Sequence, residues 1–432
     1  MRTIEYKAVD FQASLEAFCR TAGTDPKVRE AVSRVLADVA AEGDAAVARY
    51  TAQFDGATLE PGQFRIAPEE LAAAAKRLPA PDRAAIREAI RCVRAFNSRG
   101  LPKDWTARNP HGARIGEKFY PLARVGLYIP RGLASTVVMT GILAKIARVP
   151  QIAIFTPPDR EGRVSDAVLG TAHLCGIDEV YRIGGVQAVG AMAYGSATIP
   201  AVVKVFGPGN GYVVEAKRQV FGTIGVDLLP GPSEVMVIAD ASADPEFVAT
   251  DLLAQAEHGS GLEKVFLVSN SKRLVAAVHA HLRREVIALG PKAPATRVLE
   301  NGFLTVFVPD LKAAAKVADW VAPEHLELEV AAPARKQLLA TITTAGAIMQ
   351  GGWSATALGD FTAGPSHELP TGRAGRFFSG LRVSDFLRRS SLVEYDERSL
   401  RKAAPVVEAF ARMEKLDAHG RSVAVRVQGR PE

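Results

Sequence analysis

Apolar residues recur with helical spacing through the first hundred residues of the chain. Three stretches, 28–54, 68–78 and 81–99, carry apolar side chains every three or four positions, which is the period of a helix with one buried face. Proline or a capping residue precedes or opens each stretch, as is common at helix N-termini. The pattern predicts a layer of helices packed on a larger body.

From about residue 150 the pattern changes to short apolar runs separated by helical stretches. Such alternation is typical of parallel sheets in an α/β fold. A turn at 231–233 divides the runs into two groups, so they form either one sheet or two. The runs lie at 152–157, 179–185, 202–210, 234–240, 264–270, 304–310 and 346–352.

The last fifty residues differ from both patterns. Residues 397–420 read as one helix whose apolar side chains, among them Val406, Phe410 and Met413, recur at helical spacing. Such a face needs a surface to cover it, so this segment is expected to pack on another subunit.

Composition narrows the class of protein. The chain has 432 residues, 48% hydrophobic and 23% charged, which fits an enzyme of two or more domains. The net charge is +6, but the basic residues are dispersed among nearly as many acidic ones, which argues against nucleic-acid binding. The N-terminus has no signal-like apolar stretch and no window spans a bilayer, so a cytoplasmic protein is expected. The cysteines Cys19, Cys92 and Cys175 form no ligand pair and are expected to be reduced.

The first candidate chemistry lies at the end of a predicted helix. Asp244 suits its N-cap, Pro245 its first turn and Gly259 its end. Gln255 and His258 then share one face of the last turn. Two donors are too few for zinc, which takes three or four protein ligands, so any further ligands must come from elsewhere in the chain.

Glycine-rich turns follow two of the predicted strands, at 184–185 and 207–210. Their backbone amides could approach a phosphate at a helix start. Neither turn has the GxGxxG spacing, and tight strand-to-helix connections would account for both.

Three other places combine imidazole and carboxyl groups. Glu324 and His325 are adjacent after a proline, where they could move protons and activate water, although a chance pairing is common. Asp360 and His367 share a polar loop of a kind that often carries binding groups. His419 ends the tail helix, where a solvated helix terminus is the simpler interpretation.

Taken together, five segments resemble the histidinol dehydrogenase family in order and spacing. The resemblance covers nearly the whole chain and implies an α/β fold with two Rossmann-like parallel-sheet domains, N-terminal helices and a C-terminal dimerisation tail. The five segments are 206–240, 251–259, 322–328, 359–372 and 414–419.

The resemblance also implies a division of the chain. Residues 1–21 would form an N-terminal segment, and 22–127 would combine with 236–380 in a large domain holding the zinc and catalytic residues. Residues 128–235 would form an inserted NAD-binding domain, and 381–432 a tail that reaches the partner of a homodimer.

The family's reaction oxidises L-histidinol to L-histidine through a bound aldehyde, with two NAD reduced in succession. The resemblance implies that His325 removes the alcohol proton and that Glu324 activates water for the second step. Zinc would orient and polarise the substrate without changing its own redox state.

The same resemblance assigns the ligands. Zinc would be held by Gln255, His258, Asp360 and His419, the last donated by the partner subunit. NAD would contact Tyr128, Gln187 and Asn210. The implied substrate-binding residues are Ser233, Gln255, His258, His325, Asp360, His367, Glu414 and His419.

One loop departs from the family pattern. Arg131 stands where a glycine is usual, and the loop that follows Tyr128 is shorter by a few residues. Because an added arginine could bind an anion, a related zinc and NAD alcohol dehydrogenase acting on a sulfonated propanediol is the first alternative. A catalytically silent scaffold of the same fold is the second.

Overall fold

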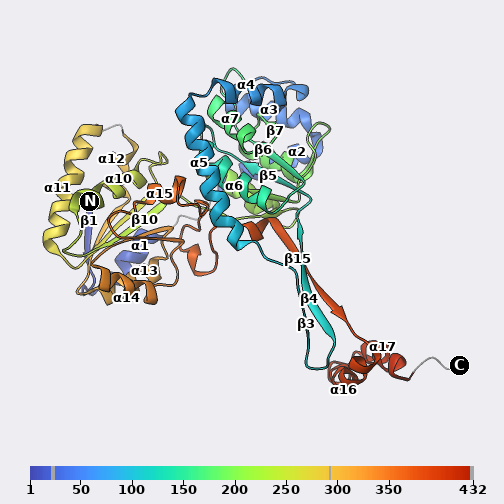
Figure 1. The fold of residues 1–432 in the computed structure, drawn as a ribbon. Coiled ribbons are helices and arrows are strands. Elements are labelled where there is room, and N and C mark those ends of the chain that lie inside the picture. The colour runs from blue at the N-terminus through green and yellow to red at the C-terminus, as the bar shows by residue number, and fades with distance from the viewer. Residues whose placement is uncertain (21–24, 291–292, 429–432) are drawn as a thin grey trace.

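The structure, a computed structural model, describes residues 1–20, 25–290 and 293–428. Two six-stranded sheets form the centres of two bodies that lie side by side, and a long arm extends from one of them (Figure 1). The predicted α/β fold with parallel sheets is therefore confirmed, and the strands form two sheets that divide at the turn of residues 231–233.

The first body is built on a parallel sheet with the order β1-β12-β11-β10-β13-β14. Its strands are β1 (Arg2–Glu5), β10 (Glu234–Ala239), β11 (Lys264–Ser269), β12 (Phe303–Phe307), β13 (His325–Glu329) and β14 (Ala347–Gln350). Helices cover both faces, each over its own apolar core. They are α1 (Phe11–Cys19), α10 (Pro245–Ala256), α11 (Lys272–Leu289), α12 (Pro294–Asn301), α13 (Leu311–Val321), α14 (Ala332–Thr341) and the short α15 (Thr356–Phe361).

The second body has the sheet order β2-β7-β6-β5-β8-β9, in which only β2 is antiparallel to its neighbour. Its strands are β2 (Arg65–Ile66), β5 (Arg124–Tyr128), β6 (Gln151–Phe155), β7 (Glu179–Tyr181), β8 (Lys204–Phe206) and β9 (Gly225–Val226). Helices again cover both faces. They are α2 (Pro26–Glu42), α3 (Asp44–Asp55), α4 (Pro68–Arg77), α5 (Ala80–Asn97), α6 (Ala134–Ile146), α7 (Asp166–Leu174), α8 (Gly185–Tyr194) and α9 (Gly211–Val220).

The division of the chain differs from the one expected at the N-terminus. Helices α2 to α5 pack on the second sheet, although Asn97 at the end of α5 donates to the Gly364 carbonyl, and β1 pairs with β12 at the edge of the first sheet. Helix α2 packs closely on α8 of the second body, since a Cβ on Gly190 of α8 would lie 3.1 Å from the Val39 side chain of α2. Helical periodicity predicts that such a face is buried, but it does not identify the sheet that buries it.

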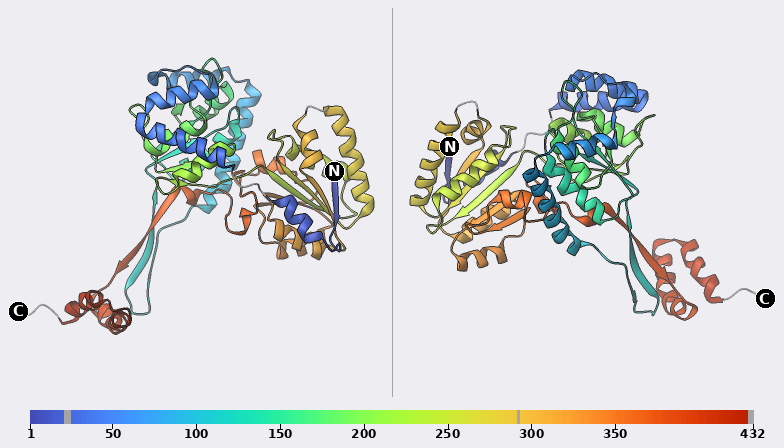
Figure 2. Two further views of the ribbon diagram at one scale, coloured as in Figure 1. Left: turned by 180° about the vertical axis from the view of Figure 1, so that it is seen from behind. Right: turned by 45° about the horizontal axis from the view of Figure 1, so that its top comes forward.

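The arm consists of a three-stranded antiparallel sheet and two terminal helices (Figures 1 and 2). Its strands are β3 (Trp105–Arg108), β4 (Arg114–Pro121) and β15 (Leu387–Glu394), and its helices are α16 (Glu397–Glu414) and α17 (Asp417–Gln428). The expected single tail helix is wrong, because the chain breaks at Lys415, whose φ is 56°, and His419 lies inside the second helix.

Two general expectations can be compared with the structure. The three cysteines are free, and burial raises the pKa of the Cys19 and Cys175 thiols to about 12. Among the helices of the described residues, none has the length and apolar character that crossing a membrane requires.

A buried ion pair stabilises the turn that follows β8. The Lys217 ammonium lies 2.5 Å from a carboxylate oxygen of Asp227 and donates to the Gly207 carbonyl at 2.8 Å. The other Asp227 oxygen accepts the Gly207 N–H at 2.7 Å. Both side chains are buried, so removing one partner leaves the other charge without compensation.

We therefore expect Lys217→Met to destabilise the protein by about 3–5 kcal/mol, since it strands the Asp227 carboxylate. The double variant with Asp227→Asn should recover a large part of that loss, because the amide oxygen can still accept the Gly207 N–H. Thermal unfolding of the two variants tests this expectation. Equal melting temperatures for the single and double variants would contradict it.

Candidate active site

The candidate site lies between the two bodies, at opposite edges of their sheets. His325 begins β13 and is in register with Val235 of β10 and Ala347 of β14, so it lies at the amino edge of the first sheet. Across the gap, the hydroxyl of Thr136, in the first turn of α6, is 3.3 Å from His367 Nε2. Groups from both bodies therefore meet in one place.

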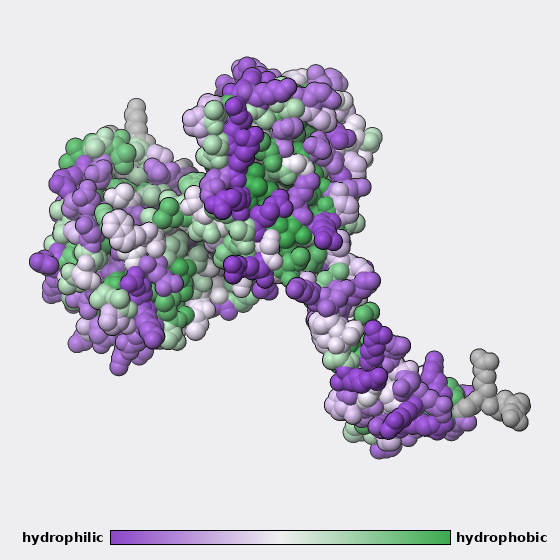
Figure 3. All heavy atoms as spheres, in the orientation of Figure 1, coloured by the Kyte–Doolittle hydropathy of each residue, from purple (hydrophilic) through white to green (hydrophobic). Residues whose placement is uncertain are grey.

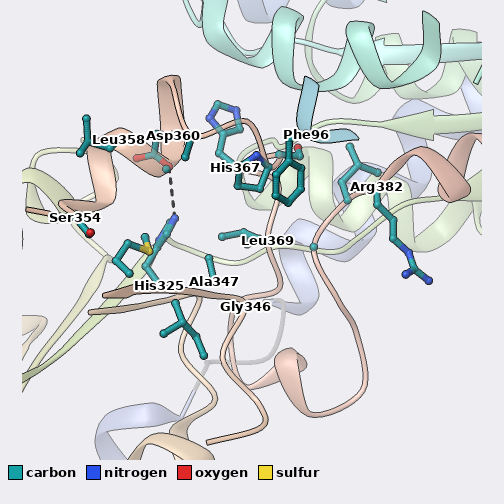
Figure 4. Close-up of a pocket in the computed structure, with 18 of the residues that line it drawn as sticks. Phe96, His325, Gly346, Ala347, Ser354, Leu358, Asp360, His367, Leu369 and Arg382 are labelled. Atoms are coloured by element: carbon teal, nitrogen blue, oxygen red, sulfur yellow. Dashed lines mark ion pairs between the residues drawn. The ribbon is translucent and has the colours of Figure 1, made fainter. Parts of the chain in front are cut away.

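A pocket of about 610 Å³ opens at this place. His325, Asp360 and His367 line it together with apolar side chains, and Phe96 and Asn97 contribute from α5 of the second body. Figure 4 shows the His325 imidazole pointing toward the Asp360 carboxylate, with His367 nearby in the pocket wall. An apolar pocket with a few convergent polar groups is the usual form of a small-molecule site.

His325 is held in a defined orientation and is 4% exposed. Its Nδ1 lies 3.2 Å from the Glu234 carbonyl oxygen, which can only accept, so Nδ1 carries a proton. Nε2 faces Asp360, with 3.5 Å to Oδ1. Burial lowers the pKa of His325, but the carboxyls of Glu324 and Asp360 outweigh it and raise the pKa to about 9.

Glu324 lies behind the imidazole. One carboxyl oxygen accepts the Glu234 N–H at 2.8 Å and is 3.7 Å from His325 Nδ1. Burial raises the pKa of Glu324, and burial likewise lowers the pKa of His367 to about 4. The pocket therefore combines a neutral imidazole, His367, with an imidazole that carboxyl groups make more basic.

The predicted metal donors of this chain lie in α10, in the turn that follows it and in α15. The N-cap Asp244 is confirmed, since its carboxylate accepts from the N–H groups of Glu246 and Phe247. However, α10 ends at Ala256, so His258 lies just past the helix and not in its last turn. His258 is exposed and near enough to Asp360 to contribute to lowering that carboxyl's pKa.

The side chain of Gln255 supports a ligand at this point. It is 1% exposed, yet neither its amide oxygen nor its amide nitrogen has a hydrogen-bond partner in the described residues. A buried amide without partners is costly, and a metal ion would satisfy its oxygen. In the described part of this single chain, no three His, Cys, Asp or Glu side chains form a metal site by themselves.

Two of the predicted site residues lie far from the pocket. Glu414 ends α16 and His419 lies in α17, both at the tip of the arm and both exposed (Figure 1). The chain does not bring them to its own pocket. Ser233, by contrast, directly precedes Glu234, the first residue of β10. It therefore lies at the same edge of the sheet as His325.

The three predicted cofactor residues surround the carboxyl ends of β5 and β8. At this point the strand order reverses, and ligands bind at such a reversal in open α/β sheets. The Tyr128 hydroxyl accepts the Gly185 N–H at 3.1 Å, and Asn210 caps α9. Gln187 is buried, and its amide oxygen lacks a hydrogen-bond partner among the described residues.

The turn at Gly207 is one that only glycine allows. Its φ is 107°, and a Cβ there would lie 2.1 Å from the Tyr128 carbonyl oxygen. The glycine therefore lets the turns after β5 and β8 approach each other, as a close-fitting nucleotide crevice requires.

Asp55 was not predicted from the sequence. It ends α3, accepts from the Gln187 amide at 3.3 Å and lies 3.3 Å from a guanidinium nitrogen of Arg131. Arg131 also donates to the Pro158 carbonyl at 2.5 Å. No local signal marks Asp55, because its partners are distant in sequence and it follows an ordinary amphipathic helix.

Comparison with known proteins agrees with the sequence resemblance. The family model for histidinol dehydrogenase matches residues 19–427. A histidinol dehydrogenase of Gluconobacter oxydans is 42% identical over 99% of this chain and 100% of its own length, and one of Ruegeria pomeroyi is 41% identical over 98% of both chains.

A solved structure shows the same fold. The histidinol dehydrogenase of Elizabethkingia anophelis superimposes with a TM-score of 0.93, at 31% identity, over 99% of this chain and 98% of that one. With a family model that spans the chain and relatives alike over nearly their full length, this protein belongs to the histidinol dehydrogenase family, whose members are NAD-dependent oxidoreductases.

Proposed function

We propose that this protein oxidises L-histidinol to L-histidine with zinc and NAD. The observation that carries the proposal is the pairing of His325 with Asp360 in a pocket that reaches the N-terminus of α6, beside the predicted cofactor crevice. The names of the relatives agree with this reaction.

Zinc would be held by Gln255, His258 and Asp360 of one subunit together with His419 of the partner subunit. One amide oxygen, two imidazoles and one carboxylate make a donor set that zinc accepts. The Gln255 amide, which has no hydrogen-bond partner among the residues the structure describes, supports this assignment. Bound there, zinc would orient the substrate and polarise the hydroxyl oxygen on the carbon that is oxidised.

The chain's own groups would move the protons. His325 Nε2 would take the alcohol proton while hydride leaves the same carbon for NAD, giving an aldehyde. Glu324 would then take a proton from water as the oxygen adds to that aldehyde. Loss of a second hydride from the hydrate to another NAD would yield the acid, so four electrons leave in two steps.

The arm supports an assembly of two subunits in which each completes the site of the other. Val406, Phe410 and Met413 expose their apolar side chains on the arm tip, and apolar residues also gather on the upper body just above the start of the arm (Figure 3). In such a homodimer, Glu414 of the partner subunit would meet the cationic end of histidinol.

The alternative of an alcohol dehydrogenase acting on a sulfonated propanediol rested on the added Arg131 and the shortened loop. Arg131 is paired with Asp55 and with the Pro158 carbonyl, so it is engaged within its own subunit. The silent-scaffold alternative depended on altered site residues, whereas Glu324, His325 and Asp360 are retained and converge. Neither alternative is favoured by the structure.

The first test separates the two half-reactions. We expect His325→Ala to slow NADH formation from L-histidinol by about 10²–10⁴-fold, because a positioned general base contributes that much. Glu324→Gln should preserve the first hydride transfer but slow oxidation of added L-histidinal. Single-turnover NADH measurements with each substrate check this. Full activity of His325→Ala on L-histidinol would contradict the assignment.

The second test concerns the metal. Treatment with a chelator should abolish activity, and added Zn²⁺ should restore it. Gln255→Leu should reduce the amount of bound zinc measured by elemental analysis, because leucine has a similar volume to glutamine but lacks the amide oxygen that would bind the metal. The matched control is Gln350→Leu in the outer pocket wall, which should retain full zinc content. Equal zinc in Gln255→Leu and the unaltered protein would contradict the donor assignment.

A further inference from the structure

An acidic side chain is buried in the first sheet beside the site but outside the proposed reaction. Glu327 is two residues after His325 on β13 and is 0% exposed. Its sheet neighbours in register, Val237 and Met349, are apolar. Burying a carboxyl group among apolar residues costs free energy unless its partners compensate.

Glu327 contacts the helix that carries one metal donor. One of its carboxyl oxygens accepts the Thr356 N–H at 2.8 Å and the Thr356 hydroxyl at 2.6 Å. Thr356 is the first residue of α15, and Asp360 lies four residues later, about one turn, in the same helix. Glu327 therefore fixes the N-terminus of the helix that presents Asp360.

Glu327 also contacts the helix that carries another donor. The Asp251 carboxyl, on α10, lies near the Glu327 carboxyl, and α10 itself contacts α15. Asp251 is one turn before Gln255. Burial, followed by the charge of Asp251, raises the pKa of Glu327 to about 8.

We infer that Glu327 is a positioning residue for the metal centre. It links two helices to the strand that carries His325: α15, which carries Asp360, and α10, which carries Gln255. It is not itself one of the proposed metal donors and acts through Thr356 and Asp251. This inference rests on the zinc site of the proposed function. Groups that orient metal ligands from behind commonly change metal affinity by about 10–100-fold when removed.

The test measures zinc affinity of the full-length protein by competition with a chromogenic chelator. Glu327→Ala should weaken zinc binding by about 10–100-fold. Glu327→Gln should bind zinc within about threefold of the unaltered protein, because its amide oxygen can accept from Thr356 and its amide nitrogen can donate to Asp251. Thr356→Val, which keeps the backbone N–H but loses the hydroxyl, should fall between them.

Glu329 provides a matched control. It is buried on the same strand, two residues farther from the site, and also lies near Asp251. Glu329→Ala should change thermal stability without weakening zinc binding. Equal zinc affinity for Glu327→Ala and the unaltered protein would overturn the inference, as would equal losses for Glu329→Ala and Glu327→Ala. If Glu327→Ala does not fold, unchanged zinc affinity in Thr356→Val overturns it.

The measurement also separates this inference from the proposed function. If the unaltered protein binds no zinc at this site, the proposed function fails with it. If the unaltered protein binds zinc and Glu327→Ala binds it equally well, only the positioning role of Glu327 fails.

Discussion

Burial of ionisable groups at the amino edge of the first sheet is the constraint around which the site is organised. His325 has no access to bulk water on its Nδ1 side, where the Glu234 carbonyl accepts its proton and Glu324 lies behind it. Its other nitrogen is left to face Asp360 and the pocket. Because neighbouring carboxyls favour the charged imidazole, the same burial that costs folding free energy also tunes the basicity of the group.

The second sheet meets this edge with its carboxyl ends, which is where α/β sheets bind nucleotides. The contact between Thr136 and His367 joins the two edges. In the proposed function, hydride transfer needs a proton acceptor and a nearby site for the hydride acceptor, and different bodies would supply them. The arm adds a third element, since Glu414 and His419 are displayed at its tip and not in the pocket of their own chain (Figure 1).

The seven apolar runs after residue 150 predicted seven strands correctly, because fully buried parallel strands consist of uninterrupted apolar residues. The strand β13 could not be found in the same way, since Glu327 and Glu329 interrupt its apolar pattern while being buried. The N-terminal helices were predicted, but their sheet was not, because amphipathicity records a buried face and not its partner.

The site divides along the same lines. Residues within long motifs, such as Gln255, His325 and Asp360, were identified through the family resemblance, and the structure brings His325 and Asp360 together. Asp55 had no such signal, because it contacts Gln187 and Arg131 only after the chain has folded. The break at Lys415 also escaped prediction, since a non-glycine residue with positive φ is uncommon.

In the proposed homodimer, each site is built from the body of one subunit and the arm of the other. Co-expression of His325→Ala and His419→Ala chains carrying different tags tests it directly, since each variant alone should be inactive. In a mixed dimer with exchanged arms, one pocket receives an intact body and an intact arm, so an equal mixture should regain about one quarter of the unaltered activity. Purified mixed dimers without activity would contradict the account.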